Sequence, residues 1–140
     1  MSLKETINKK FIEEFKTGVY LRRFPYEIMK QRITTAEKSG QVELPLTDEY
    51  IVGLIAKECK ERQEMLEIYK PGDISYEIAK YTFEELSQYL PKQMTEEEVV
   101  EIIKKLRETE SNPGKLIGLT VKEVGNRFDK SKIAALVKNL

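Results

Sequence analysis

The sequence has no histidine, no tryptophan and a single cysteine among its 140 residues. Because histidine is the commonest general base and a common zinc ligand, its absence excludes Ser-His-Asp triads and zinc sites of the histidine type. Cys59 cannot form an internal disulfide, and there is no second thiol to complete a cysteine metal site. We therefore predict that Cys59 packs in the core as a small apolar side chain.

Long apolar runs are also absent. No stretch of about 18 apolar residues could span a membrane, and the N-terminus, Met1–Glu5, lacks an apolar segment with a cleavage site. We accordingly expect a cytoplasmic protein that does not associate with a membrane. The composition, with 40% hydrophobic and 34% charged residues, is typical of amphipathic helices in a folded chain and not of a disordered one.

Motifs that would mark an active site are missing as well. Gly114-Lys115 lacks the preceding glycine and the following Ser or Thr of a phosphate-binding loop. Glu96, Glu97 and Glu98 occupy consecutive helical positions that point in different directions, so helix capping is favoured over acid/base or metal-binding roles. No serine, tyrosine or lysine is spaced to meet an activating group. The sequence indicates no catalytic residue, no metal and no cofactor, which favours a protein that is not an enzyme on its own.

One segment near the middle divides the chain. Pro91 cannot donate an amide hydrogen bond and disfavours a helical Leu90, so a helix that runs up to Tyr89 should end there. Thr95 then begins a new helix, because its hydroxyl can accept from the amide of Glu98 while the Glu98 carboxylate reaches back to the Thr95 amide. The predicted division is an N-terminal domain at residues 1–90, a hinge at 91–94 and a C-terminal domain at 95–140.

Apolar residues at helical spacing predict two helices at the start of the chain. The first begins at Leu3 and ends near Gly18. The second follows Pro25, which suits a first helical position and would kink a helix already under way. Their apolar faces are Leu3, Ile7, Phe11 and Phe15 on the first helix and Tyr26, Met29, Ile33 and Ala36 on the second.

Two further helices complete the predicted N-terminal domain. Thr47 caps the third, which has no internal stop before Pro71 and is expected to be the longest. Arg62 interrupts its apolar side, and we expect the Arg62 stem to pack while the charged head reaches water. The fourth helix starts at Asp73 or Ser75. Four helices joined by short turns predict an up-and-down bundle.

The C-terminal part reads as three short helices. Pro113 suits the first position of the middle one, a turn follows at Gly125 and Asn126, and Asp129 can cap the last. The inward side of the last helix is predicted to be Ile133, Leu136, Val137 and Leu140. No segment shows the alternation of a strand, so the fold class is all-α: a helical bundle followed by a small three-helix domain.

Charge is unevenly distributed along a chain whose net charge is zero. Residues 1–33 carry 8 Lys and Arg against 4 Asp and Glu, residues 34–111 carry 10 against 18, and residues 112–140 carry 6 against 2. The basic ends either contact a polyanion or fold back against the acidic middle, and charge alone does not separate these alternatives.

Two groups of residues are candidates for binding. In the C-terminal group, small or turn residues would let a partner approach the backbone while cations neutralise phosphates. Alternatively, Gly118 permits close helix packing and the cations only solvate the surface. The close-approach or turn residues are Gly114, Gly118, Gly125, Asn126 and Asp129, and the candidate RNA-binding residues are Lys115, Arg127, Lys130, Lys132 and Lys138.

The second group lies near the N-terminus, where four cations flank two aromatic residues. Phe24 and Tyr26 either belong to the core, which is the commoner case, or form a platform on which bases stack. The cations of this group are Arg22, Arg23, Lys30 and Arg32.

Three motifs resemble the GatB/YqeY family, and the similarity covers nearly the whole chain. They are Leu46-Thr47-Asp48-Glu49 at the start of the long helix, Tyr89-Leu90-Pro91-Lys92-Gln93 followed by Thr-Glu-Glu-Glu, and Gly114-Lys115-x-x-Gly118 leading to Arg127-x-Asp129. The last two are the most specific.

The resemblance implies a stand-alone YqeY-like protein, with a helical bundle and a C-terminal domain similar to the tail of the B subunit of aspartyl/glutamyl-tRNA amidotransferases. That tail helps to hold tRNA, while the chemistry lies in other domains. Three functions follow as alternatives. The chain is a non-catalytic module for tRNA or another structured RNA, or a module that docks on an amidotransferase or other protein. Alternatively, it takes part in carbon-nitrogen ligation with glutamine as donor, only within a complex.

The family commonly has Gly-Arg-x-Asp-Gly at the last turn, and this chain departs from that pattern. Asn126 and Lys130 occupy the two glycine positions. Because asparagine tolerates a left-handed conformation, we expect the turn to survive. Lys130 adds a charge but removes a point of close approach.

Overall fold

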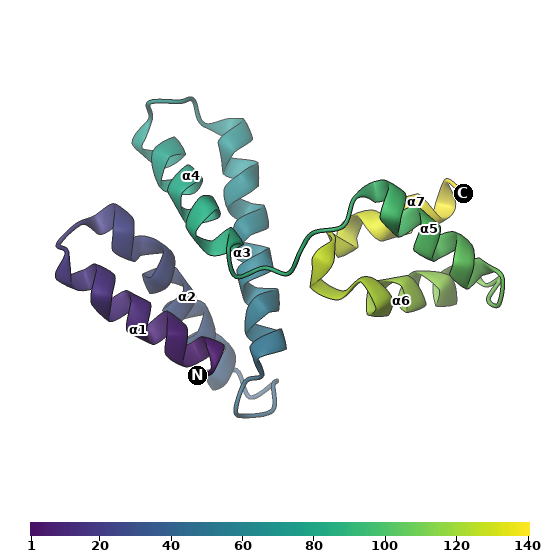
Figure 1. The fold of residues 1–140 in the computed structure, drawn as a ribbon, viewed down its shortest axis with the longest axis horizontal. Helices are drawn as coiled ribbons and strands as arrows, with labels where there is room; N and C mark the ends of the chain where they lie inside the picture. Colours follow the sequence, from purple (N-terminus) through teal and green to yellow (C-terminus); the bar gives the residue numbers. More distant parts are fainter. The chain divides into compact units, whose positions relative to one another are not determined.

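The computed structural model describes all residues, 1–140, and is entirely helical, with no strand. The predicted all-α class is therefore confirmed. The chain divides into two compact units, Met1–Tyr89 and Leu90–Leu140, each with buried residues of its own (Figure 1). We call them the N-terminal unit and the C-terminal unit.

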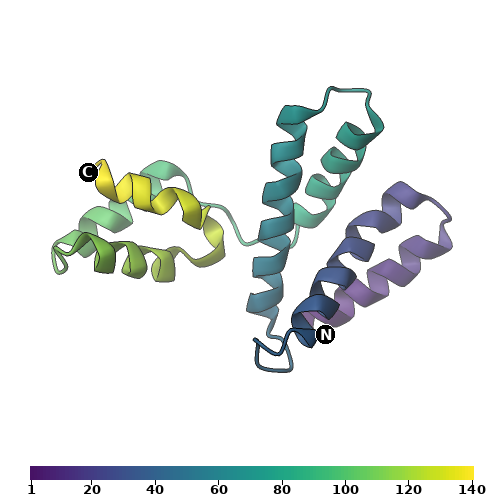
Figure 2. The ribbon, with the colours of Figure 1, turned by 180° about the vertical axis from the view of Figure 1, so that it is seen from behind.

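The N-terminal unit consists of two helical hairpins. α1 (Leu3–Lys16) pairs with α2 (Tyr20–Lys38), and α3 (Asp48–Ile68) pairs with α4 (Ile74–Ser87). Because α2 contacts both α3 and α4, it joins the two hairpins (Figures 1 and 2). The four predicted helices are present, and α3 is the longest, as predicted.

Local capping explains where α3 begins. The Thr47 hydroxyl accepts a hydrogen bond from the amide of Tyr50 at 3.1 Å, so the predicted N-cap is confirmed. The carboxylate of Asp48 accepts from the amide of Leu3 at 3.0 Å. This bond ties the first residue of α1 to the first residue of α3.

The core of the N-terminal unit lies between the two hairpins. Cys59 is part of it, as predicted, and burial raises the pKa of its thiol to about 12. The thiol is therefore protonated at neutral pH and is a poor nucleophile. The buried apolar residues of this core are Ile7, Tyr26, Met29, Ile33, Ala36, Ile51, Ile55, Cys59, Ala79 and Leu86.

α2 runs through Pro25, so the prediction that this helix begins at the proline is wrong. The amide of Arg23 already donates to the carbonyl of Val19, which shows that the helix is under way before Pro25. Only the hydrogen bond that a residue at position 25 would donate to Leu21 is lost. The burial of Pro25 and the packing of Phe24 beneath the Arg62 guanidinium, 5.0 Å from the ring centroid, offset that loss.

A carboxylate is buried where α2 meets α3. Glu58 is only 1% exposed, and it accepts from Arg32 of α2 at 2.9 Å and from Arg62 of its own helix at 3.1 Å. The expectation that the head of Arg62 reaches water is wrong, because the Arg62 side chain is 13% exposed and its guanidinium bonds to Glu58. Arg32 also pairs with Glu61. Two guanidinium groups thus neutralise one buried carboxylate.

A second buried polar contact joins α2 to the end of α4. The Tyr26 hydroxyl donates to Glu85 at 2.6 Å and lies 2.9 Å from the hydroxyl of Tyr89. Since a phenol carries a single proton, Tyr89 must donate in the second bond. Burial, followed by these hydrogen bonds, raises the pKa of Tyr26, so the hydroxyl stays protonated and keeps donating.

The C-terminal unit is built from α5 (Glu96–Arg107), α6 (Pro113–Val124) and α7 (Ile133–Lys138), with 3₁₀ turns at Gly125–Arg127 and Lys130–Lys132. Its core consists of Val99, Ile103, Leu116, Val124, Ile133 and Val137. The prediction that Leu140 faces inward is wrong: it lies beyond the end of α7 and is 42% exposed.

The start of α5 shows the predicted capping box. The Thr95 hydroxyl accepts from the amide of Glu98 at 3.2 Å, and the Glu98 carboxylate accepts from the Thr95 amide. The residue before it, Met94, donates its amide to the carbonyl of Arg127 at 2.7 Å. Met94 therefore belongs to the C-terminal unit through a backbone bond as well as through its side chain, which packs on the core.

Candidate nucleic-acid interface

α6 begins at a well-defined cap. The Asn112 side chain accepts from the amides of Gly114 and Lys115 at 2.9 and 3.2 Å, and Pro113 occupies the first helical position, where its missing amide proton costs nothing. The cap fixes which side of α6 faces the core. Leu116, Thr120 and Val124 are the buried residues of this helix.

The opposite side of α6 is exposed and carries cations around a glycine. Lys115, Gly118, Leu119 and Lys122 are spaced three and four residues apart, so they share one side of the helix, and all four are exposed. A Cβ added at Gly118 would meet no atom within 4 Å. Packing within the chain therefore does not require a glycine at position 118. Close helix packing, the alternative considered above, does not explain this residue. Lys122 was not singled out from the sequence, although its spacing of seven from Lys115 would have placed it on this side.

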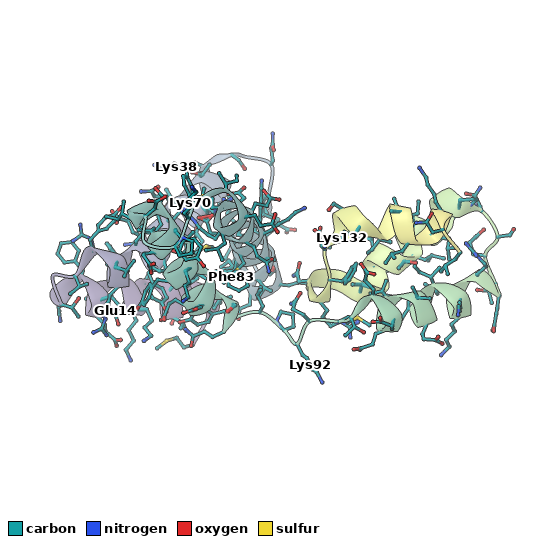
Figure 3. The ribbon with its side chains drawn as sticks, turned by 90° about the horizontal axis from the view of Figure 1, so that it is seen from above. Glu14, Lys38, Lys70, Phe83, Lys92 and Lys132 are labelled. Carbon is teal, nitrogen blue, oxygen red and sulfur yellow. The ribbon has the colours of Figure 1, made fainter.

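The remaining C-terminal lysines are also exposed and form no ion pair. Lys130, Lys132 and Lys138 lie in or beside the second 3₁₀ turn and α7, with Lys132 directly before α7 (Figure 3). The ion pairs of the C-terminal unit include none of them, nor Lys115 or Lys122. Their ammonium groups are therefore available to an anionic partner.

Arg127 has a different environment from the lysines. Its guanidinium donates to the carbonyl of Glu123 at 2.7 Å and to that of Val124 at 3.1 Å. These carbonyls belong to the last turn of α6, where a cation is also favoured by the helix dipole. In this structure Arg127 caps α6, and its backbone carbonyl receives the amide of Met94.

The turn after α6 depends on Gly125 and not on Asn126. Gly125 has φ +58° and ψ −132°, a conformation that is essentially confined to glycine. No other residue type in the chain has a positive φ, so Asn126 does not use the left-handed conformation that we expected it to tolerate. Asp129 accepts from the Ser131 amide at 3.0 Å and caps the second 3₁₀ turn, not α7 itself.

Replacing Gly125 by alanine is expected to lower the free energy of unfolding of the C-terminal unit by roughly 1 to 3 kcal/mol, because the new Cβ forces a strained backbone. No atom lies within 4 Å of that Cβ, so the loss is due to the backbone alone. Gly118→Ala is the matched control: it lies inside a helix with open space, and should stabilise by about 0.5 to 1 kcal/mol. Urea unfolding measures both. Equal effects of the two substitutions would contradict this account.

The four cations of the N-terminal candidate group, in contrast, already have partners within their own unit. Arg22 binds Glu14 through two nitrogens, at 2.7 and 3.3 Å, and Arg32 binds Glu58 and Glu61. Figure 3 labels Glu14, which is itself buried. These arginines are occupied in holding helices together.

Aromatic rings contact the other two cations of this group, Lys30 and Arg23. The Lys30 ammonium lies 4.4 Å from the centroid of the Phe11 ring, and the Arg23 guanidinium covers two rings near the start of α2. Tyr26 is fully buried, so the alternative in which it offers a face for stacking is wrong and the core alternative is right.

No group of three or more Cys, Asp or Glu side chains gathers in a way that could hold a metal ion. None of the helices combines the length and the apolar character needed to cross a membrane.

Comparison with protein families gives a match that spans nearly the whole chain. The model of the Yqey-like protein family matches residues 4–140. No curated protein matches the chain in sequence.

Proposed function

Because the chain belongs to the YqeY-like protein family, we propose that it is a non-catalytic RNA-binding module whose C-terminal unit holds a structured RNA. Its resemblance to the tail of the B subunit of tRNA amidotransferases makes tRNA the first RNA to test. In that setting the module is an accessory, and other subunits carry out the chemistry.

The observation that supports this proposal is the contrast between the two groups of candidate cations, the N-terminal group around Phe24 and Tyr26 and the lysines of residues 112–140. Arg22 and Arg32 are paired with carboxylates and Arg23 is covered by rings, whereas the exposed lysines at positions 115, 122, 130, 132 and 138 form no ion pair. Cations without partners can replace the counterions of a phosphate backbone, and the released counterions drive binding. The proposed contact residues are Lys115, Lys122, Lys130 and Lys132, with Lys138 at the end of α7.

The exposed side of α6 suits a phosphate backbone in shape as well as in charge. Gly118 lies between Lys115 and Lys122 and has no side chain, so a ribose-phosphate strand can approach the helix closely while the lysines reach phosphates on either side. Lysines bind phosphates as flexible point charges, which fits recognition of backbone and shape more than of sequence.

Arg127 enters this proposal as a positioning residue. Its guanidinium is engaged by the end of α6, and its carbonyl by Met94. It therefore shapes the turn that leads from Lys122 to Lys130. We expect its substitution to act on RNA binding through the stability of the C-terminal unit.

Changing Lys115, Lys122, Lys130 and Lys132 together to glutamine is expected to weaken tRNA binding and to flatten its salt dependence. Each lysine that contacts a phosphate contributes about 0.7 to 0.9 to the slope of log K against log salt concentration, so the loss should approach 3 units. Filter binding or fluorescence anisotropy with purified tRNA at several salt concentrations measures both quantities.

A matched control separates local contacts from total charge. Changing Lys38, Lys57, Lys70 and Lys80 to glutamine removes the same four charges from exposed positions of the N-terminal unit, two of which are labelled in Figure 3. This variant should keep most of the slope. If both variants lose affinity for tRNA equally, the proposed contact surface is wrong. If the unmodified chain binds no tRNA at low salt, the proposed function is wrong.

A further inference from the structure

Four large apolar side chains are exposed within nine consecutive residues at the turn between α1 and α2. They are Ile12 (55% exposed), Phe15 (56%), Val19 (46%) and Tyr20 (49%), and we call them the turn patch. The prediction that Phe15 packs inside with the rest of the α1 apolar face is wrong, because Phe15 lies in the last turn of α1 on a side that is left exposed. Grouped apolar residues left in water mark an interaction site more often than isolated ones do.

Arg23 holds the two rings of the turn patch in a fixed arrangement. Its guanidinium carbon lies 5.2 Å from the centroid of the Phe15 ring and 5.3 Å from that of Tyr20, within the range of a cation-π contact. Each ring also touches one further ring: Phe11 lies 5.8 Å from Phe15 in an edge-to-face contact, and Phe24 lies 5.6 Å from Tyr20. A partner would therefore meet a patch that is already ordered, which reduces the entropy cost of binding.

The charges around the turn patch favour an acidic partner. Lys9 and Lys16 are exposed and form no ion pair, whereas Arg23 pairs with Glu27 of its own helix at 3.8 Å. Glu13 is the opposing exposed acid in this segment. Because the rim is net positive, the surface that covers the patch should carry carboxylates around its apolar centre.

Two other occupants fit these observations less well. A second copy docked symmetrically would bring Lys16 and Arg23 of one copy close to Lys16 and Arg23 of the other. Repulsion between these like charges costs free energy. Bases of a nucleic acid would stack on the two rings and leave Ile12 and Val19 in water, since aliphatic side chains offer no face for stacking. A protein surface can cover all four residues.

We propose that the turn patch is a docking site for a partner protein, which inserts an apolar or aromatic segment flanked by Asp or Glu residues. Aromatic and arginine side chains such as those of Phe15, Tyr20 and Arg23 are the usual energetic centres of protein interfaces. The site lies on the N-terminal unit and does not depend on RNA binding by the C-terminal unit.

The test uses the full chain and a library of random 12-residue peptides displayed on phage. Peptides enriched on the unmodified protein are synthesised, and their affinities are compared by fluorescence anisotropy with those for Phe15→Ala/Tyr20→Ala. Ile68→Ala/Ile74→Ala is the matched control, because it truncates apolar residues that are 74% and 77% exposed at the α3–α4 turn. Thermal unfolding of each variant confirms that the fold is retained.

We expect enriched peptides to carry apolar or aromatic residues next to Asp or Glu, and to bind the Phe15/Tyr20 variant at least roughly tenfold more weakly. Affinity for the Ile68/Ile74 variant should be unchanged, and replacing the peptide acids by lysine should abolish binding. The proposal is overturned by a failure to enrich peptides, or by enriched peptides that bind all variants alike. It is also overturned if Phe15 and Tyr20 are needed for something other than peptide binding. Such a result would be dimerisation, or binding of oligouridine or of anionic vesicles, that is lost in the Phe15/Tyr20 variant.

Discussion

Replacing Glu58 by alanine is expected to lower the free energy of unfolding by about 3 to 5 kcal/mol. Glu58 is 1% exposed and neutralises the guanidinium groups of Arg32 and Arg62. Without it, Arg62 loses its carboxylate partner in a place from which water is largely excluded, and the pair between Arg32 and the half-exposed Glu61 is left between α2 and α3. Urea or thermal unfolding followed by circular dichroism measures the loss.

Glu61→Gln is the control for this prediction. Glu61 lies one turn further along α3 and pairs with the same Arg32, but its side chain is 44% exposed. Because ion pairs in contact with water contribute little, this substitution should cost less than about 1 kcal/mol. Similar losses for both substitutions would show that burial is not what makes Glu58 important.

A triple replacement tests the same account from the opposite direction. Changing Glu58 to leucine together with Arg32→Met and Arg62→Met removes the buried charges as a group. Such replacements in other proteins are often neutral or stabilising, because the desolvation of the charges disappears along with their attraction. We expect the triple variant to be far more stable than Glu58→Ala, which would identify the buried guanidinium groups left without Glu58 as the source of the loss.

Replacing Ile103 by alanine is expected to cost about 2 to 5 kcal/mol and to unfold the C-terminal unit before the N-terminal one. Ile103 is fully buried, and the core it belongs to has only six buried apolar residues. A core of this size has little stability to lose. Differential scanning calorimetry should show a lower-temperature transition for this unit, and tRNA binding should be lost above it.

The matched control is Ile55→Ala in the N-terminal unit. Ile55 is also fully buried and lies in α3, so the chemical change is the same. This variant should shift the transition of the N-terminal unit and leave the other in place. If both variants shift one common transition by similar amounts, the two units unfold together and the independence that we predict is wrong.

Much of the helical layout could be read from the sequence because the signals that start and stop helices are local. The capping box of Thr95 and Glu98, the cap at Thr47 and the proline at the first position of α6 all act within one turn. Helical spacing likewise identified Ile133 and Val137 as core residues. The expectation for Pro25 was wrong because the proline removes a single hydrogen bond, and its own burial and the packing of Phe24 offset that loss.

The candidate interface could be predicted in part. The lysines near the C-terminus were recognised by type and density, and their exposure follows from their side of each helix. The engagement of Arg127 could not be foreseen, since a guanidinium of that length reaches either solvent or the nearby carbonyls of Glu123 and Val124. Lys122 was missed because residue type and density, rather than the side of α6, indicated the candidates.

The sequence by itself determined the all-α class, the positions of the caps and the residues that each helix can bury, since these depend on neighbours within a few positions. Only the tertiary structure decided which charges have partners. Glu58 binds Arg32, which is 26 residues away in the sequence, and one guanidinium contacts the rings of both Phe15 and Tyr20, which lie on either side of a turn. Such contacts depend on how helices pack, and the spacing of residues along one helix carries no information about the helix that will face it.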